Sequence, residues 1–93
     1  MITIKSLVQE QGATVVDVRS SWEFADGHVE GALNIPLEEI PQRMDEFQSL
    51  QKPIVVYCRS GNRSGMAEGF LKAAGIQEVH NGGGLADMKI QLM

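Results

Sequence analysis

The residues best suited to chemistry lie in one loop that begins at Cys58, the only cysteine of the chain. Residues 59–64 continue this loop as Arg-Ser-Gly-Asn-Arg-Ser. The apolar run over residues 54–57 predicts a buried strand before the loop, and the apolar spacing over residues 64–74 predicts a helix after it. Backbone N–H groups of such a loop and of the first helical turn can converge on an anion, helped by the positive helix end. The sequence therefore predicts an anion site next to a cysteine.

Cys58 is a candidate nucleophile in this setting. Arg59, Arg63 and the helix end favour a thiolate over a thiol, which lowers the pKa of a cysteine. Gly61 permits backbone conformations that bulkier residues resist. The same donors would hold a persulfide anion on Cys58, because its terminal sulfur needs hydrogen bonds around it. The alternative is a cysteine buried as inert filler, but two arginines, a glycine and a helix start together favour a functional site.

The elements that must position this loop follow from the alternation of apolar runs and turn residues. Strands are expected at residues 3–4, 14–18, 33–35, 54–57 and 78–80. Helices are expected after capping boxes at Ser6 and Ser20, over residues 37–50 with a division at Pro41, and over residues 64–74 and 85–92. Strands that alternate with helices indicate an α/β fold with a largely parallel sheet covered on both faces. In such sheets, ligands bind beyond the carboxyl ends of the strands, where the Cys58 loop lies.

Length and charge limit what else the chain can be. Its 93 residues fit a single domain over residues 1–93, and the 43% hydrophobic and 22% charged residues exclude a disordered tail. No apolar run approaches the ~18 residues of a membrane span. The formal net charge is -4, although residues 52–72 carry four cations and one anion. We therefore expect a locally basic site, with no nucleic-acid partner and no membrane partner.

The lone cysteine also limits redox chemistry and metal binding. It cannot form an internal disulfide, and it has no partner for a Cys-rich metal site, so we expect no metal. Residues 1–12 hold one early lysine, a short apolar segment and no small-residue cleavage site, which does not resemble a signal peptide. We expect a cytoplasmic protein in a reducing environment.

Four segments resemble the motifs of the rhodanese sulfurtransferase family, in the same order along the chain. Residues 58–64 closely resemble the active-site loop of that family. Residues 16–19, Val-Asp-Val-Arg, are similar to its Asp-Val-Arg strand end. Residues 27–36, Gly-His-Val-Glu-Gly-Ala-Leu-Asn-Ile-Pro, resemble its Gly-His-Ile signature, and residues 82–83 lie where it has a Gly-Gly turn. Met88 stands near the position where the family often has tryptophan. The resemblance covers nearly the whole chain, as in a single rhodanese domain.

The resemblance implies a five-stranded, mostly parallel sheet with helices on both faces. It also implies a ping-pong reaction in which a small anionic donor such as thiosulfate gives its outer sulfur to Cys58 and sulfite leaves. Cyanide, a thiol or the thiol of a protein then takes the sulfur from the persulfide. The resemblance implies no metal and no organic cofactor. Arg59 and Arg63 would hold the sulfonate end, and loop N–H groups would hold the transferred sulfur. The implied substrate-binding residues are Arg59, Ser60, Gly61, Asn62, Arg63 and Ser64.

Polar residues outside the loop are expected to support it. Asp17 and Arg19 follow a strand on the side of the predicted site. Asp17 could approach the loop and order it, but a structural salt bridge or cap is the favoured interpretation. Arg19 could pair with Glu23, four residues later. His28 lies in a turn and is expected to be structural, because transfer to a preformed thiolate needs no base.

Two other functions stay open from the sequence. A cysteine-dependent phosphatase also surrounds an anion with a thiolate and an arginine, but its loop has five residues between them, whereas Cys58 and Arg63 have four. The second is a sulfur-relay module that hands sulfur to a protein acceptor. Such a module would show poor turnover with small thiols.

Overall fold

Four parallel strands run through the centre of the structure, a computed structural model that describes residues 2–93. Their order in the sheet is β2-β1-β3-β4. The strands are β1 (Thr14–Asp17), β2 (Leu33–Asn34), β3 (Ile54–Cys58) and β4 (Val79–Gly84). The helices are α1 (Ile4–Gln9), α2 (Ser21–Ala25), α3 (Met44–Ser49), α4 (Asn62–Ala73) and α5 (Leu85–Gln91), with 3-10 turns η1 (Leu37–Glu39) and η2 (Pro41–Arg43) before α3.

The predicted fifth strand is wrong. Residues 3–4, expected as a strand, instead start α1, with Thr3 as its N-cap. The Ser6 backbone N–H donates to the Thr3 hydroxyl at 3.0 Å, and the Thr3 backbone N–H donates to the Ser6 hydroxyl at 3.1 Å. This reciprocal capping satisfies two N–H groups locally, so the segment enters a helix without a sheet partner. Ser6 was expected as the cap, and it lies one turn inside the helix.

The other predicted elements are confirmed, with shifted ends. The segment after Pro36 is divided near Pro41, as expected, into η1, η2 and α3. The predicted capping box of Ser20 and Glu23 starts α2. Helix α4 begins at Asn62, two residues before the expected start, and β4 extends to Gly84.

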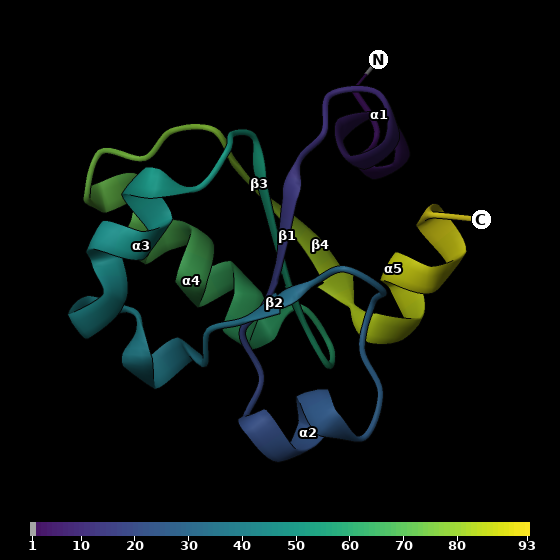
Figure 1. The fold of residues 1–93 in the computed structure, drawn as a ribbon, viewed down its shortest axis with the longest axis horizontal. Coiled ribbons are helices and arrows are strands. Elements are labelled where there is room, and N and C mark those ends of the chain that lie inside the picture. Colours follow the sequence, from purple (N-terminus) through teal and green to yellow (C-terminus); the bar gives the residue numbers. More distant parts are fainter. Residues whose placement is uncertain (1) are drawn as a thin grey trace.

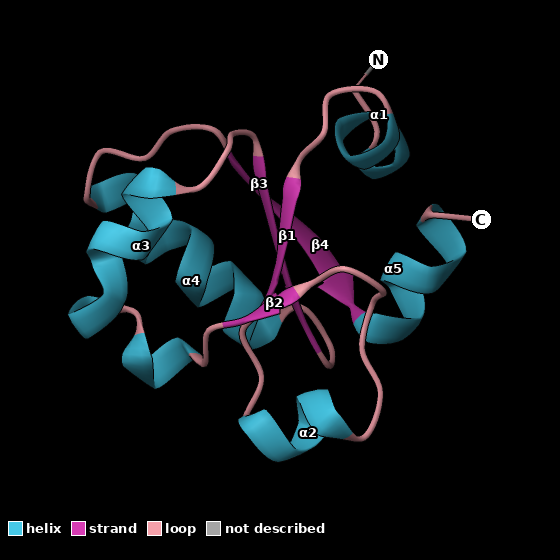
Figure 2. Ribbon diagram, in the orientation of Figure 1, coloured by secondary structure: helices cyan, strands magenta, loops and turns pink. Residues whose placement is uncertain are grey.

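Helices cover both faces of the sheet, as predicted. Figures 1 and 2 show α3 and α4 on one side of the strands, and α1 and α5 on the other. Alternate residues of the central strands enter two separate cores because successive strand side chains point to opposite faces. The core under α4 includes Val16, Val56 and Cys58, and the core under α1 and α5 includes Val15, Val55 and Tyr57. Met88 is fully buried in the second core and fixes α5 on the sheet.

The sheet order brings three strand ends together around Cys58. Asp17 of β1 lies in register with Tyr57 of β3, and Gly84 of β4 lies in register with Cys58. Helix α2 follows β1 beyond this edge (Figure 1). The carboxyl ends of β1, β3 and β4 thus form the edge at which a ligand site is expected.

Candidate active site

The Cys58 sulfur lies inside a tight loop between β3 and α4. The Gly61 N–H donates to Sγ at 3.0 Å, and the Ser64 N–H donates to it at 3.4 Å. The Ser64 hydroxyl also lies 3.4 Å from Sγ. Both Cys58 and Ser64 are fully buried. The structure thus brings Gly61 and Ser64, two of the predicted loop residues, onto the sulfur.

These hydrogen bonds favour the thiolate. Burial alone raises the pKa of Cys58, because a charge loses solvation inside the protein. The Ser64 hydroxyl and the backbone N–H groups of Ser64, Ser60 and Gly61 outweigh that effect and lower the pKa below the ordinary cysteine value. The predicted activation of the cysteine therefore has a physical cause in the loop.

Two glycines make this loop geometry accessible. Gly61 caps α4 with a φ of 96°, a left-handed conformation that side chains resist. Gly84 on β4 faces the backbone of the loop, and a Cβ there would overlap the Arg59 carbonyl. The loop therefore packs directly on the backbone of β4.

Arg63, which is expected to hold a donor, forms an ion pair with Glu23. Its two terminal nitrogens donate to the Glu23 carboxylate at 2.8 and 3.0 Å, in a bidentate ion pair. Glu23 also accepts from the Ser20 N–H and hydroxyl. The Arg63 side chain is 36% exposed and that of Glu23 is 13% exposed. This pair ties α2 to the first turn of α4.

The suggested pair of Arg19 with Glu23 is wrong, because Arg19 binds Asp17. The Arg19 guanidinium donates to both Asp17 oxygens at 2.7–3.0 Å. It also donates to the Gly27 carbonyl at 2.7 Å, and it lies 5.8 Å from the centre of the Tyr57 ring. Asp17 and Arg19 are both buried. The structural interpretation of Asp17 is thus confirmed: it forms a buried salt bridge.

His28 is also structural, as expected. Its Nδ1 lies 2.8 Å from the Phe24 carbonyl oxygen, and because a carbonyl only accepts, this nitrogen carries the proton. The ring stacks on Phe24 with centroids 3.6 Å apart. These contacts hold the turn that follows α2.

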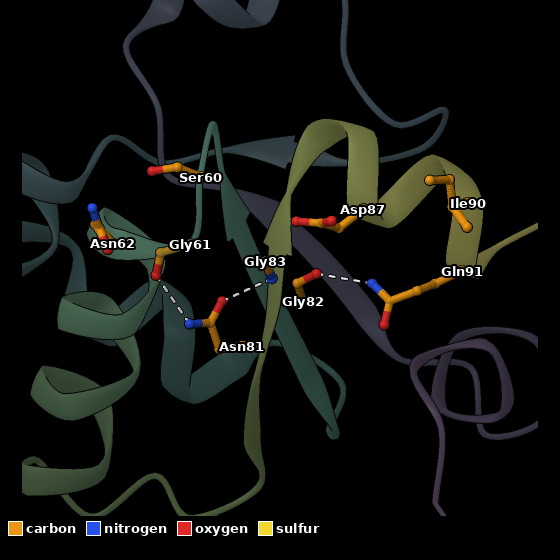
Figure 3. A pocket seen from close by; sticks show the side chains of 9 residues that line it. All are labelled: Ser60, Gly61, Asn62, Asn81, Gly82, Gly83, Asp87, Ile90 and Gln91. Atoms are coloured by element: carbon orange, nitrogen blue, oxygen red, sulfur yellow. Dashed lines mark hydrogen bonds between the residues drawn. The ribbon is translucent and has the colours of Figure 1, made fainter.

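The remaining predicted residues line two pockets on either side of the loop. Ser60 and Asn62 line a pocket of about 490 Å³ together with Asn81, Asp87 and Gln91 (Figure 3). Arg59 lines a second pocket of about 420 Å³, with Trp22, Glu23 and Leu85 among its walls. The Trp22 side chain is largely exposed there. The two loop arginines thus have different surroundings.

Asn81 is a site residue that the sequence reasoning missed. Its Nδ2 donates to the Gly61 carbonyl at 3.1 Å, and its Oδ1 accepts from the Gly83 N–H at 2.9 Å (Figure 3). The same Oδ1 accepts from the Ser64 hydroxyl at 2.7 Å. The sequence held one indication of this role: Asn81 directly precedes the glycine turn, at the end of a predicted strand. Glu23 was expected to form a capping box with Ser20, and Arg19 was its suggested ion-pair partner, but nothing along the chain links it to Arg63.

Two kinds of feature are absent from residues 2–93. In this range, no group of three or more His, Cys, Asp or Glu side chains could hold a metal ion. Within the same range, no helix is both long and apolar enough to cross a membrane.

Comparison with known proteins identifies the family. The family model for the rhodanese-like domain matches residues 3–89 of this sequence. The chain belongs to the rhodanese family. Thiosulfate sulfurtransferase PspE of Escherichia coli is 38% identical to this rhodanese domain over 78% of the chain and 71% of the relative. The structure of a human single-domain sulfurtransferase superposes on this one with a TM-score of 0.75, at 27% identity over 98% of this chain and 96% of that one.

Longer proteins also contain a similar segment. The tRNA uridine(34) hydroxylase of Cronobacter sakazakii is 31% identical over 90% of this chain, which spans only 26% of that protein. The Escherichia coli and human proteins are both named sulfurtransferases, which supports sulfur transfer as the general class of activity. The rhodanese-like α/β fold is confirmed, with four strands in place of the expected five.

The first prediction concerns the Cys58 thiol. Titration of its ultraviolet thiolate absorbance should show a midpoint below the ~8.5 of an ordinary cysteine, because the loop hydrogen bonds stabilise the anion. The signal is clean, since the chain has one cysteine and one tyrosine, and burial raises the pKa of Tyr57 to about 12. Cys58→Ser should remove the step. A midpoint above the ordinary value would contradict the assigned hydrogen bonds.

The second prediction concerns the Glu23–Arg63 pair. Glu23→Gln should lower the free energy of unfolding at pH 7 by about 1 kcal/mol, because the pair is only partly shielded from water. The Arg63 and Ser20 hydrogen bonds lower the pKa of Glu23 from 4.5 to about 2. The stabilisation is therefore complete above about pH 4.5 and is lost as the pH falls toward 2.

Urea denaturation of both proteins at pH 7 and pH 3 measures this difference. Glu30→Gln at an exposed carboxylate is the matched control and should leave the stability unchanged at both pH values. A loss of stability in Glu23→Gln that is the same at both pH values would show that charge is not the cause.

Proposed function

We propose that this rhodanese domain is a sulfurtransferase that carries sulfane sulfur as a persulfide on Cys58. The donor is thiosulfate or a similar small anion, and the acceptor is cyanide or a thiol. The observation that carries the proposal is the convergence of the Gly61 and Ser64 N–H groups on a buried cysteine sulfur at a helix start. A reducing compartment such as the cytoplasm would keep this thiol available.

Both half-reactions are displacements at sulfur. The Cys58 thiolate attacks the outer sulfur of thiosulfate, a new S–S bond forms, and the donor S–S bond breaks with its electron pair leaving on sulfite. The acceptor, as cyanide or thiolate, then attacks the terminal sulfur of the persulfide. The Cys58 thiolate leaves, and thiocyanate or a persulfide is the product. All electrons come from these nucleophiles, so the proposal includes no metal and no cofactor.

The loop supplies the stabilisation that these steps need. The Gly61 and Ser64 N–H groups donate to Sγ of Cys58. They therefore stabilise the thiolate that attacks the donor and the thiolate that leaves when the acceptor takes the sulfur. Ser60 and Asn62 lie on either side of Gly61 in this loop, and both line the neighbouring pocket. Because Cys58 is fully buried, a donor reaches Sγ only when the loop of residues 59–64 shifts.

Arg59 is the better candidate for binding the donor's sulfonate. It follows Cys58 directly, is exposed, and lines a pocket next to Trp22. The charge of Arg63 is largely balanced by Glu23. We therefore assign the sulfonate to Arg59 and a positioning role to Arg63, which holds the first turn of α4 under the loop.

Of the other functions considered, sulfur relay to a protein thiol is compatible with this chemistry, because only the acceptor differs. The exposed Trp22 beside Arg59 supports it as a second candidate. The phosphatase is disfavoured by the family match and by the four residues between Cys58 and Arg63.

The third prediction tests the persulfide directly. Incubation with thiosulfate should raise the intact mass by one sulfur, about 32 Da, and cyanide should remove the gain. Cys58→Ser should show no gain because it lacks the nucleophile. If neither thiosulfate nor a low-molecular-weight persulfide adds sulfur to the wild-type protein, the proposed function is wrong.

The fourth prediction separates the two loop arginines. Arg59→Ala should raise the KM for thiosulfate about tenfold through the loss of a charge-assisted hydrogen bond, and Arg59→Lys should recover part of it. Arg63→Ala should lower the thermal stability and change this KM less, because Glu23 already balances its charge. Steady-state kinetics and thermal melts measure both effects. An unchanged KM in Arg59→Ala would overturn the sulfonate assignment.

A further inference from the structure

The orientation of the Asn81 amide is fixed by its backbone partners. The Gly61 carbonyl can only accept a hydrogen bond, so it must face the Asn81 NH₂ group, which lies 3.1 Å away. The Gly83 N–H can only donate, so it must face Oδ1, 2.9 Å away. Figure 3 shows both bonds. Oδ1 is therefore the atom that faces Ser64, and it accepts the hydroxyl proton of Ser64 at 2.7 Å.

The Ser64 hydroxyl has one proton and two neighbours that can accept it. Asn81 Oδ1 lies at 2.7 Å and Cys58 Sγ at 3.4 Å. When Cys58 is a thiol, its S–H can donate to Ser64 while Ser64 donates to Asn81, so every group is satisfied. When Cys58 is a thiolate, Sγ and Oδ1 compete for the same proton. Ser64 is fully buried, so water does not resolve this competition.

We propose that Asn81 is a positioning residue that acts on Cys58 through the Ser64 hydroxyl. This inference rests on the proposed persulfide function. In the persulfide the negative charge lies on the terminal sulfur, Sγ is a weak acceptor, and Ser64 donates to Asn81. When an acceptor attacks, the charge returns to Sγ and the hydroxyl turns toward it. Asn81 thus holds a donor in place for the step that releases the thiolate.

A purely structural role predicts the opposite effect on the thiol. Asn81 also anchors Gly61, whose N–H donates to Sγ. If Asn81 acted only as an anchor, its removal would weaken the Gly61 bond and raise the Cys58 pKa. If it competes for the Ser64 proton, its removal frees the hydroxyl for Sγ and lowers that pKa. The sign of the shift separates the two roles.

The experiment is a double-mutant cycle read by the thiolate absorbance. Asn81→Leu has nearly the shape of asparagine but neither accepts nor donates, and position 81 is exposed, so the fold should tolerate it. Below the midpoint, this variant should have a roughly three- to tenfold larger thiolate fraction than the wild type. Ser64→Ala should move the midpoint upward. In the Ser64→Ala background, Asn81→Leu should not lower the midpoint, because no hydroxyl remains that could turn toward Sγ.

A second variant tests the same coupling with the opposite sign. Asn81→Asp keeps an acceptor for Ser64 and should raise the midpoint of Cys58 more when Ser64 is present than in the Ser64→Ala background.

The charged groups around the loop are Arg59, Arg63 with Glu23, and Asp17 with Arg19, together with His80 and Asp87 near Asn81. The single and double variants keep all of them, so their contributions cancel in the cycle.

A rise or no change of the midpoint in Asn81→Leu, or equal shifts in both backgrounds, would overturn the proposal. Thermal melts verify that each variant is folded. The titration uses no sulfur donor, so its result is independent of the mass experiment. A midpoint that shifts as expected without any sulfur gain would refute the persulfide function while leaving the coupling of Asn81 to Cys58 intact.

Discussion

The rest of the site depends on how a negatively charged sulfur is tolerated inside the protein. Burial opposes the Cys58 thiolate, and only the hydrogen bonds aimed at Sγ offset that cost. They exist because β3 ends at Cys58 and α4 begins at Asn62, with Gly61 in a left-handed conformation between them. The backbone contact with Gly84 then fixes the height of the loop above the sheet. The fold therefore serves mainly to bring unpaired N–H groups to one atom.

Two ion pairs surround this centre and have different roles. Asp17 and Arg19 form a buried pair that closes the end of β1 and reaches the turn at Gly27. Glu23 and Arg63 form a partly exposed pair that connects α2 with α4. Each pair balances its own charge, so Arg59 carries the net positive charge of the loop. A site that combines one such cation with neutral N–H groups suits the proposed reaction, in which the charge of a small anion moves from one sulfur to another.

Most of the fold and the anion-binding loop around Cys58 could be predicted from local patterns, whereas the partners of the polar side chains could not. Apolar runs and turn residues located β1, β3 and α4 because burial imposes their periodicity. Residues 3–4 were misassigned because Thr3 and Ser6 satisfy each other's N–H groups, an effect that outweighs the strand preference of a short apolar segment. The pair of Glu23 with Arg63 joins residues 40 positions apart. Asn81 reaches the loop only through the pairing of β4 with β3.

The burial of Cys58 also bears on the lifetime of the protein. A thiolate reacts with peroxide as well as with sulfur donors, and its oxidation to sulfinic or sulfonic acid is a permanent loss. The chain has no second cysteine that could trap a sulfenic acid as an internal disulfide. Because the sulfur is covered by its own loop, an oxidant meets it no more often than the loop opens. The burial of Cys58 therefore limits oxidative damage to its sulfur.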